Sequence, residues 1–192
     1  MSSWSCNEES ALAADDESTS SQSAVVVSGK VSLPPDLVLE ESSTNAAAAA
    51  ALYVTVRPDT PDNVPAAILS GTRGKPPPVM AARFASPKFP FDFELVAPQN
   101  LTPEGAAASS GSSGTADNPA ALQDISSLWW AKDDNLIVSA RWDSDGVAAT
   151  RSPEDLVGRA VFRRSAGAAS SSGTVEIKLE GRGAFGKFVT GK

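Results

Sequence analysis

The sequence predicts an all-β fold, an antiparallel β-sandwich or small barrel of about seven or eight short strands. Apolar and polar residues alternate over several short segments, and a period of two is typical of strands with one buried face. The chain also contains 14 glycines and 14 prolines, which separate these segments and favour turns. No convincing amphipathic helix lies between the segments, whereas an α/β fold would require helices between its strands.

Eight segments are predicted as strands. The first surrounds Gly29, and a glycine inside a strand marks a bulge or the close approach of another segment. Alternation is clearest in four later segments: residues 52–57, 91–95, 136–142 and 175–179. Three segments carry a weaker pattern: residues 65–69, 79–84 and 159–163.

Two other segments allow more than one local structure. Residues 119–130 are predicted as a helix or a turn, with Asn118 as cap and Pro119 at the first helical position. Residues 76–78 are three consecutive prolines, which either form a polyproline ligand or lead rigidly into an edge strand. We favour the edge strand, because proline cannot donate to a sheet ladder and Val79 follows directly.

The chain is predicted to hold one folded domain with additions. Residues 1–23 carry five acidic residues and no basic one among Ser and Ala, which predicts a disordered acidic tail. Residues 24–182 form the predicted β-sandwich domain, and residues 183–192 a basic C-terminal tail. Three segments rich in Ala, Ser or Gly are predicted as loop insertions: residues 40–51, 105–121 and 165–173.

Composition excludes several chemistries. The chain has no histidine, so it lacks an imidazole base, a Ser-His or Cys-His nucleophile pair and a His-containing zinc site. Cys6 is the single cysteine, so no internal disulfide or all-thiolate metal cluster can form. The remaining candidates for catalysis are neighbouring carboxylates on turns, which usually face solvent. We therefore expect a non-enzyme without a cofactor or a metal.

Charge and hydropathy limit the partners. The net charge of −7 disfavours binding to a phosphate backbone, because that affinity comes from Lys and Arg. No apolar run approaches the ~20 residues that a membrane span needs. We expect another protein as partner, with no nucleic acid and no membrane span, and we assign no oligomeric state. The N-terminus fits neither a signal peptide nor a transit peptide, so we expect the cytosol, or an organelle if a leader precedes Met1.

The segment Asp143-Ser144-Asp145-Gly146 resembles the start of a calcium loop. Its spacing is one ligand pair short and no closing glutamate follows, whereas Gly146 stands where a turn needs a residue with positive φ. We therefore favour a simple turn here.

Tryptophans and arginines are the candidate binding residues. Trp129 and Trp130 are adjacent, so on an extended segment their rings would point to opposite sides, one into the core and one outward. We favour the alternative, that both rings pack inside the sandwich. An exposed ring would anchor a partner protein or stack on a sugar. The predicted partner-binding residues are Trp129, Trp130, Trp142, Arg57 and Arg141.

A series of short motifs follows the predicted strands in a characteristic order. They are residues 28–33 with Pro35 and Leu37, then 52–58, 64–68, 89–95, 136–141, 145–148, 153–158 and 175–179. In this order they resemble the C-terminal immunoglobulin-like domain of the cytochrome c-type biogenesis protein that chaperones apocytochrome c in the bacterial haem-ligation system. The segment at residues 153–158 matches the Pro-x-Asp-Leu-x-Gly corner of that family.

The resemblance implies an immunoglobulin-like sandwich with an accessory binding role. It does not imply the family's chaperone activity, because the membrane helices and helical repeats that bind peptide have no counterpart in this chain. We therefore expect a non-catalytic protein-interaction or assembly module. The alternative is a carbohydrate-binding sandwich that uses exposed tryptophans as a stacking platform.

Overall fold

The fold is taken from a computed structural model, which describes nine stretches of the chain. They are residues 24–35, 50–60, 64–69, 75–107, 125–132, 135–150, 152, 155–164 and 173–182. Both predicted tails, residues 1–23 and 183–192, lie outside these stretches, as do most residues of the three predicted insertions.

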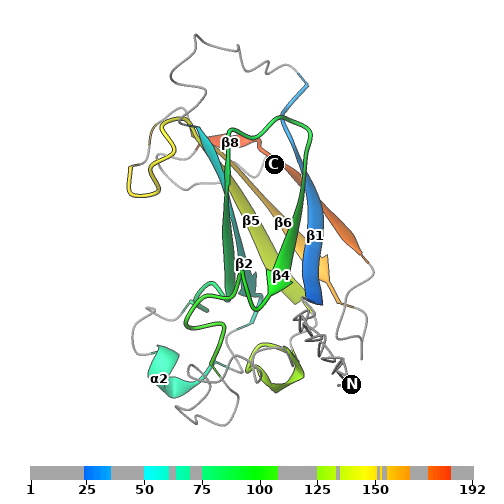
Figure 1. Cartoon of the computed structure of the whole chain (residues 1–192), viewed down its shortest axis with the longest axis vertical. Coiled ribbons are helices and arrows are strands. Elements are labelled where there is room, and N and C mark those ends of the chain that lie inside the picture. Colours follow the sequence, from blue (N-terminus) through cyan, green and yellow to red (C-terminus); the bar gives the residue numbers. More distant parts are fainter. Residues whose placement is uncertain are drawn as a thin grey trace, which may run out of the picture.

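The described residues form two β-sheets packed face to face (Figure 1). The smaller sheet has the order β4-β1-β7, and the larger one has the order β3-β2-β5-β6-β8. The smaller sheet contains β1 (Ala24–Ser32), β4 (Phe91–Ala97) and β7 (Thr174–Lys178). The larger sheet contains β2 (Ala51–Pro58), β3 (Met80–Ala85), β5 (Asn135–Asp143), β6 (Leu156–Arg163) and β8 (Gly181–Arg182). The predicted all-β sandwich is confirmed.

Strand pairing is antiparallel with one exception. β1 runs parallel to β7, with Gly29 opposite Val175 and Val31 opposite Ile177. On its other side β1 pairs antiparallel with β4, and a register shift between Val25 and Val27 marks an irregularity there. The expectation of a wholly antiparallel fold is therefore wrong for this one pair.

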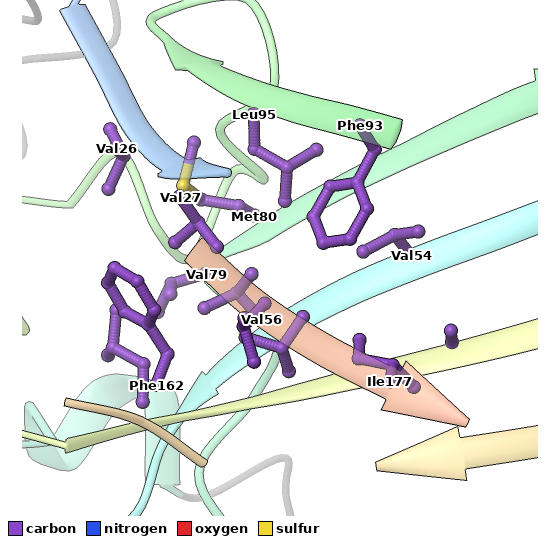
Figure 2. Packing of buried hydrophobic residues seen from close by; sticks show 14 of the residues in the cluster. Val26, Val27, Val54, Val56, Val79, Met80, Phe93, Leu95, Phe162 and Ile177 are labelled. Atoms are coloured by element: carbon purple, nitrogen blue, oxygen red, sulfur yellow. The ribbon is translucent and has the colours of Figure 1, made fainter. Parts of the chain in front are cut away.

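The core lies between the two sheets and consists of the alternating apolar positions. Figure 2 shows Val27, Phe93 and Leu95 of the smaller sheet packed toward Val54 and Val56 of the larger one. All five side chains are buried. Because side chains alternate along a strand, the residues between these positions face away from the core.

Two glycines allow close contacts that a side chain would block. A Cβ atom at Gly29 would lie 2.5 Å from the ring of Phe93 and 2.6 Å from Val175. A Cβ atom at Gly158 of β6 would lie 2.3 Å from the backbone oxygen of Lys178 in β7. The prediction that Gly29 marks a close approach is thus confirmed, and Gly158 has the same role between the two sheets.

Of two local predictions, the weak strand at residues 65–69 is wrong, and the helix or turn at residues 119–130 is confirmed for its described part. Residues 65–69, predicted as a weak strand, contain the short helix α2 (Ala66–Leu69), in which the Ile68 amide donates to the Pro65 oxygen at 2.9 Å. Period two over five residues cannot separate a strand from a single turn that begins after a proline. Of residues 119–130, the described part forms one 3₁₀ turn, η2 (Ile125–Ser127), followed by turns.

The three prolines at residues 76–78 precede Val79 and β3, and β3 is an edge strand of the larger sheet. This placement confirms the interpretation that they lead into an edge strand.

Candidate functional site

The outer face of the larger sheet carries the candidate site. On β2, the residues that alternate with its buried positions face outward: Tyr53, Thr55 and Arg57. The strand register places Tyr53 between Arg83 of β3 and Arg141 of β5, and it places Thr55 between Ala81 and Ser139. Two rows of outward side chains therefore cross the sheet.

Strand β6 adds two further arginines to this face of the sheet. Arg159 lies opposite Ser139, Val161 opposite Ile137, and Arg163 opposite Asn135. Arg159, Arg163 and Arg83 are exposed, and Val161 has 51% of its surface exposed. Together these positions form a surface that we call the arginine face: Tyr53, Thr55, Arg57, Arg83, Ile137, Ser139, Arg141, Arg159, Val161 and Arg163.

The outer face of the smaller sheet is different. Lys30 stands between Asp92 and Glu176, and its amine is 3.6 Å from the Asp92 carboxylate. Glu94 and Lys178 lie on the same side at neighbouring register positions. Acidic and basic side chains alternate there, whereas the arginine face gathers charges of one sign.

Tyr53 lies at the centre of the row that also contains Arg83 and Arg141. Its hydroxyl donates to the Gly146 oxygen at 2.6 Å, and the Arg83 Nε atom donates to the same hydroxyl at 3.2 Å. The guanidinium carbon of Arg141 lies 5.2 Å from the centre of the Tyr53 ring, and that of Arg83 lies 5.9 Å from it. Two arginines are thus held against one aromatic ring, at distances where cation–π attraction operates.

Arg141 also forms an ion pair within its own strand. Its Nη2 atom is 2.7 Å from the Asp143 Oδ2 atom and donates to the Ala148 oxygen at 3.0 Å. The Asp143 side chain is 1% exposed, and its Oδ1 atom accepts no hydrogen bond. Burial, the facing carboxyl of Asp145 and the charge of Asp155 raise the pKa of Asp143, although Arg141 opposes them. Asp143 therefore takes up a proton more readily than an ordinary aspartate, and the protonated carboxyl can donate to Asp145.

The loop after β5 uses its carboxylates to hold its own shape. Asp145 accepts hydrogen bonds from the Thr150 hydroxyl at 2.7 Å and the Val147 amide at 2.8 Å. These bonds, together with the shared proton of Asp143, lower the pKa of Asp145. Gly146 has a φ of 69°, which confirms the predicted turn.

Asp155 closes the far end of this loop. It is buried, and it accepts hydrogen bonds from the amides of Ser152 at 3.0 Å and Ser144 at 3.4 Å. Within the stretches that the structure covers, no three Cys, Asp or Glu side chains are placed to share a metal ion.

Arg57 lies near the other end of the arginine face. It is half-buried, and its Nη1 atom donates to the Pro76 oxygen at 3.3 Å. Burial, and then the positive charge of Arg159, lower the pKa of Arg57. Arg57 and Arg159 therefore repel each other, and an anion placed between them would relieve that repulsion.

The three predicted tryptophans lie elsewhere. Trp129 and Trp130 are 3% and 0% exposed, so the interpretation that both rings pack inside is confirmed. They follow η2 in a turn rather than on an extended strand, which lets both rings point inward. Their indole nitrogens donate to the backbone oxygens of Glu104 and Gly105, both at 2.7 Å. Trp142 is half-buried and packs against the core.

The structure thus separates the five predicted binding residues. Arg57 and Arg141 are on the arginine face, whereas all three tryptophans are on the inner side. Sequence reasoning missed Tyr53, Arg83, Arg159 and Arg163. The available signal was that arginine recurs on one face of a strand, as at Arg159 and Arg163, but only the register shows that these positions lie beside the arginines of other strands.

No protein-family model matches this chain, and comparisons with curated proteins and with solved structures found no match. Among the residues that the structure covers, no helix is long and apolar enough to cross a membrane.

Proposed function

We propose that this protein is a non-catalytic interaction module that docks a partner protein on the arginine face. The observation that carries the proposal is the gathering of five arginines on one sheet face of a chain whose net charge is −7. Among the described strand positions of this face the one carboxylate is Asp143, which is already paired with Arg141. The face therefore keeps a positive excess.

The residue types of the arginine face suit a protein partner. Arginine and tyrosine are enriched at the energetic centres of protein interfaces, where a rigid ring and a planar fork of donors make contacts at low entropic cost. Tyr53 holds Arg83 and Arg141 in place, so these donors are partly preorganised. Val161 adds exposed apolar surface beside Arg159 and Arg163. A partner surface that presents carboxylates would complement this arrangement.

The carbohydrate-binding alternative finds no support in the tryptophans. A sugar-stacking platform needs exposed rings, whereas Trp129 and Trp130 are buried and their indole N–H groups donate to backbone. We therefore prefer the protein-binding proposal.

Membership of the cytochrome c-type biogenesis family, and an immunoglobulin-like topology, remain proposals that rest on the order of sequence motifs. Immunoglobulin sandwiches place strands one, two, five and four in one sheet, whereas β2 and β5 here share a sheet with β3 and β6. The strand order thus adds no support to the resemblance. A soluble, intracellular location is likewise part of the proposal, and cell fractionation would test it.

A matched pair of charge reversals tests the docking surface. Arg159→Glu with Arg163→Glu alters the arginine face, and Lys30→Glu with Lys178→Glu makes the same change in charge on the smaller sheet. Each full-length variant would be used for affinity capture from the source cell. We expect one protein to be retained by the wild type and by the lysine variant but lost by the arginine variant. Equal retention by both variants would refute the proposed surface.

A further inference from the structure

The charge of this chain is distributed unevenly between the sandwich and the rest. Among the described residues, Lys and Arg outnumber Asp and Glu by 12 to nine, although the whole chain has 16 against 23. All of the negative excess therefore belongs to segments outside the described residues. The most one-sided of these is residues 1–23, which hold five acidic residues and no basic one: Glu8, Glu9, Asp15, Asp16 and Glu17.

Residues 1–23 are attached at the end of the sandwich where Arg57 of the arginine face lies. They lead directly into β1, whose first residue, Ala24, pairs with Ala97 of β4. The turn after Ala97 contacts β3, where the Ala81 amide donates to the Asn100 oxygen at 2.9 Å. Since Met80 lies opposite Val56, this is the end of the larger sheet at which Arg57 stands.

The segment is also long enough to cover the arginine face. Twenty-three residues span up to ~75 Å when extended, whereas the eight residues of β2 span about 26 Å. A tethered segment is present at an effective concentration in the millimolar range, so several weak ion pairs suffice to hold it. One exposed ion pair contributes little alone, but the attractions between five carboxylates and several arginines add together.

We propose that residues 1–23 bind in cis to the arginine face, with their carboxylates placed among the guanidinium groups of Arg57, Arg83, Arg159 and Arg163. The acidic segment then competes with any external protein for this surface. This regulatory consequence rests on the proposed function, whereas the cis contact itself does not. An external partner gains access only by displacing the segment. Its apparent dissociation constant is therefore the intrinsic one divided by the fraction of molecules in which the face is open.

Cys6 provides a direct test, because it is the single cysteine of the chain and lies inside the acidic segment. A nitroxide attached to Cys6 of the full chain broadens the NMR signals of nearby amides. We expect broadening at Thr55, Ser139 and Arg159 and little at Ser28 or Glu176 on the opposite sheet. The broadening should disappear at high salt, where exposed charges are screened.

Variants and a mixing control make the test decisive. Replacing the five acidic residues of the segment by their amides should abolish the broadening, as should Arg159→Glu with Arg163→Glu. The lysine pair Lys30→Glu and Lys178→Glu should retain it. Broadening confined to the smaller sheet, or equal over both sheets, would overturn the proposal. So would broadening that appears equally when labelled chains are mixed with separate isotope-enriched chains, because the contact would then be between copies.

The outcome is separable from that of the docking proposal. Broadening on the arginine face, with partner capture unaffected by the arginine variant, would refute the proposed function and leave the cis contact standing. Capture of a partner that requires Arg159 and Arg163, without broadening on the arginine face, would refute the cis contact and leave the proposed function standing. If both hold, the amide-substituted segment should raise partner affinity about ten-fold when the covered form outnumbers the open one by about ten to one.

Discussion

Removal of the Arg141 guanidinium should destabilise the protein through Asp143. Arg141→Met keeps the aliphatic stem against Tyr53 but deletes the donor that lies 2.7 Å from the Asp143 carboxylate. That carboxylate is 1% exposed and its other oxygen already accepts no hydrogen bond. Breaking a buried pair on one side costs about 3–5 kcal/mol, because the remaining charge is left without a partner. We expect about 3 kcal/mol, since Asp143 can partly escape the cost by sharing a proton with Asp145.

The same substitution should cost much less once Asp143 is neutral. In Asp143→Asn the amide oxygen still accepts from Arg141, and the amide nitrogen donates toward Asp145, as a protonated Asp143 would. We therefore expect Asp143→Asn alone to change the unfolding free energy by less than about 1 kcal/mol. Arg141→Met in this background removes one hydrogen bond from a charged donor, at about 1.5 kcal/mol. The coupling between the two sites is then about 1.5 kcal/mol.

Urea denaturation at pH 7, followed by tryptophan fluorescence, measures all four members of this double-mutant cycle. Trp129 and Trp130 are buried in the folded state and so report its loss. Equal costs for Arg141→Met in the two backgrounds, or a cost below about 1 kcal/mol in the wild type, would refute the assignment of Asp143 as a buried, dependent charge.

Three further predictions concern pH, packing and buried hydrogen bonds. Because the pKa of Asp143 is raised, the folded state binds a proton that the unfolded state lacks, so unfolding free energy should rise as pH falls from neutral toward 3.8. Asp143→Asn should remove this rise in urea titrations at several pH values, and a rise of the same size in the variant would contradict the prediction. The lowered pKa of Asp145 acts in the opposite direction, and its stabilisation is lost only as pH falls below 3.8 through its folded pKa. Gly158→Val should destabilise the folded protein by about 3 kcal/mol in thermal melts, because the added Cβ would lie 2.3 Å from a backbone oxygen of β7. A variant of wild-type stability would show that the sheets are further apart. Trp130→Phe should lower the unfolding free energy in urea titrations by about 2 kcal/mol, because it leaves the Gly105 oxygen without its donor. Trp142→Phe, at a half-buried position, should lower it by less. The reverse order would count against the described core.

Much of the fold could be predicted because strands with one buried face carry their own signal. The alternation in residues 52–57 and 136–142 located β2 and β5, and it also divided their residues correctly between the inner and outer faces. The short helix α2 was missed because five residues are too few to distinguish the two periods. The parallel pairing of β1 with β7 depends on contacts between residues far apart in sequence, which no local pattern encodes.

The candidate site was predicted only in part, for a similar reason. Arg57 and Arg141 were recognisable as arginines on outward positions of strands, but nothing local shows that Arg83 and Arg159 lie beside them. The tryptophans were predicted as binding residues, yet their exposure depends on the backbone: adjacent rings diverge on a strand but both turn inward after η2. Composition gave the net charge of −7 correctly, yet it concealed a sandwich whose described residues have a basic excess.

An NMR titration of the full chain with an acidic peptide tests the central claim, that the arginine face is a docking surface. The chain would carry the five amide substitutions in residues 1–23, so that its own carboxylates do not compete, and the probe would be a peptide of alternating glutamate and serine. We predict that amide signals of Thr55, Ser139 and Arg159 shift, that Arg159→Glu with Arg163→Glu abolishes the shifts, and that Lys30→Glu with Lys178→Glu preserves them. Shifts centred on the smaller sheet, or equal responses of the two charge-reversed variants, would contradict it.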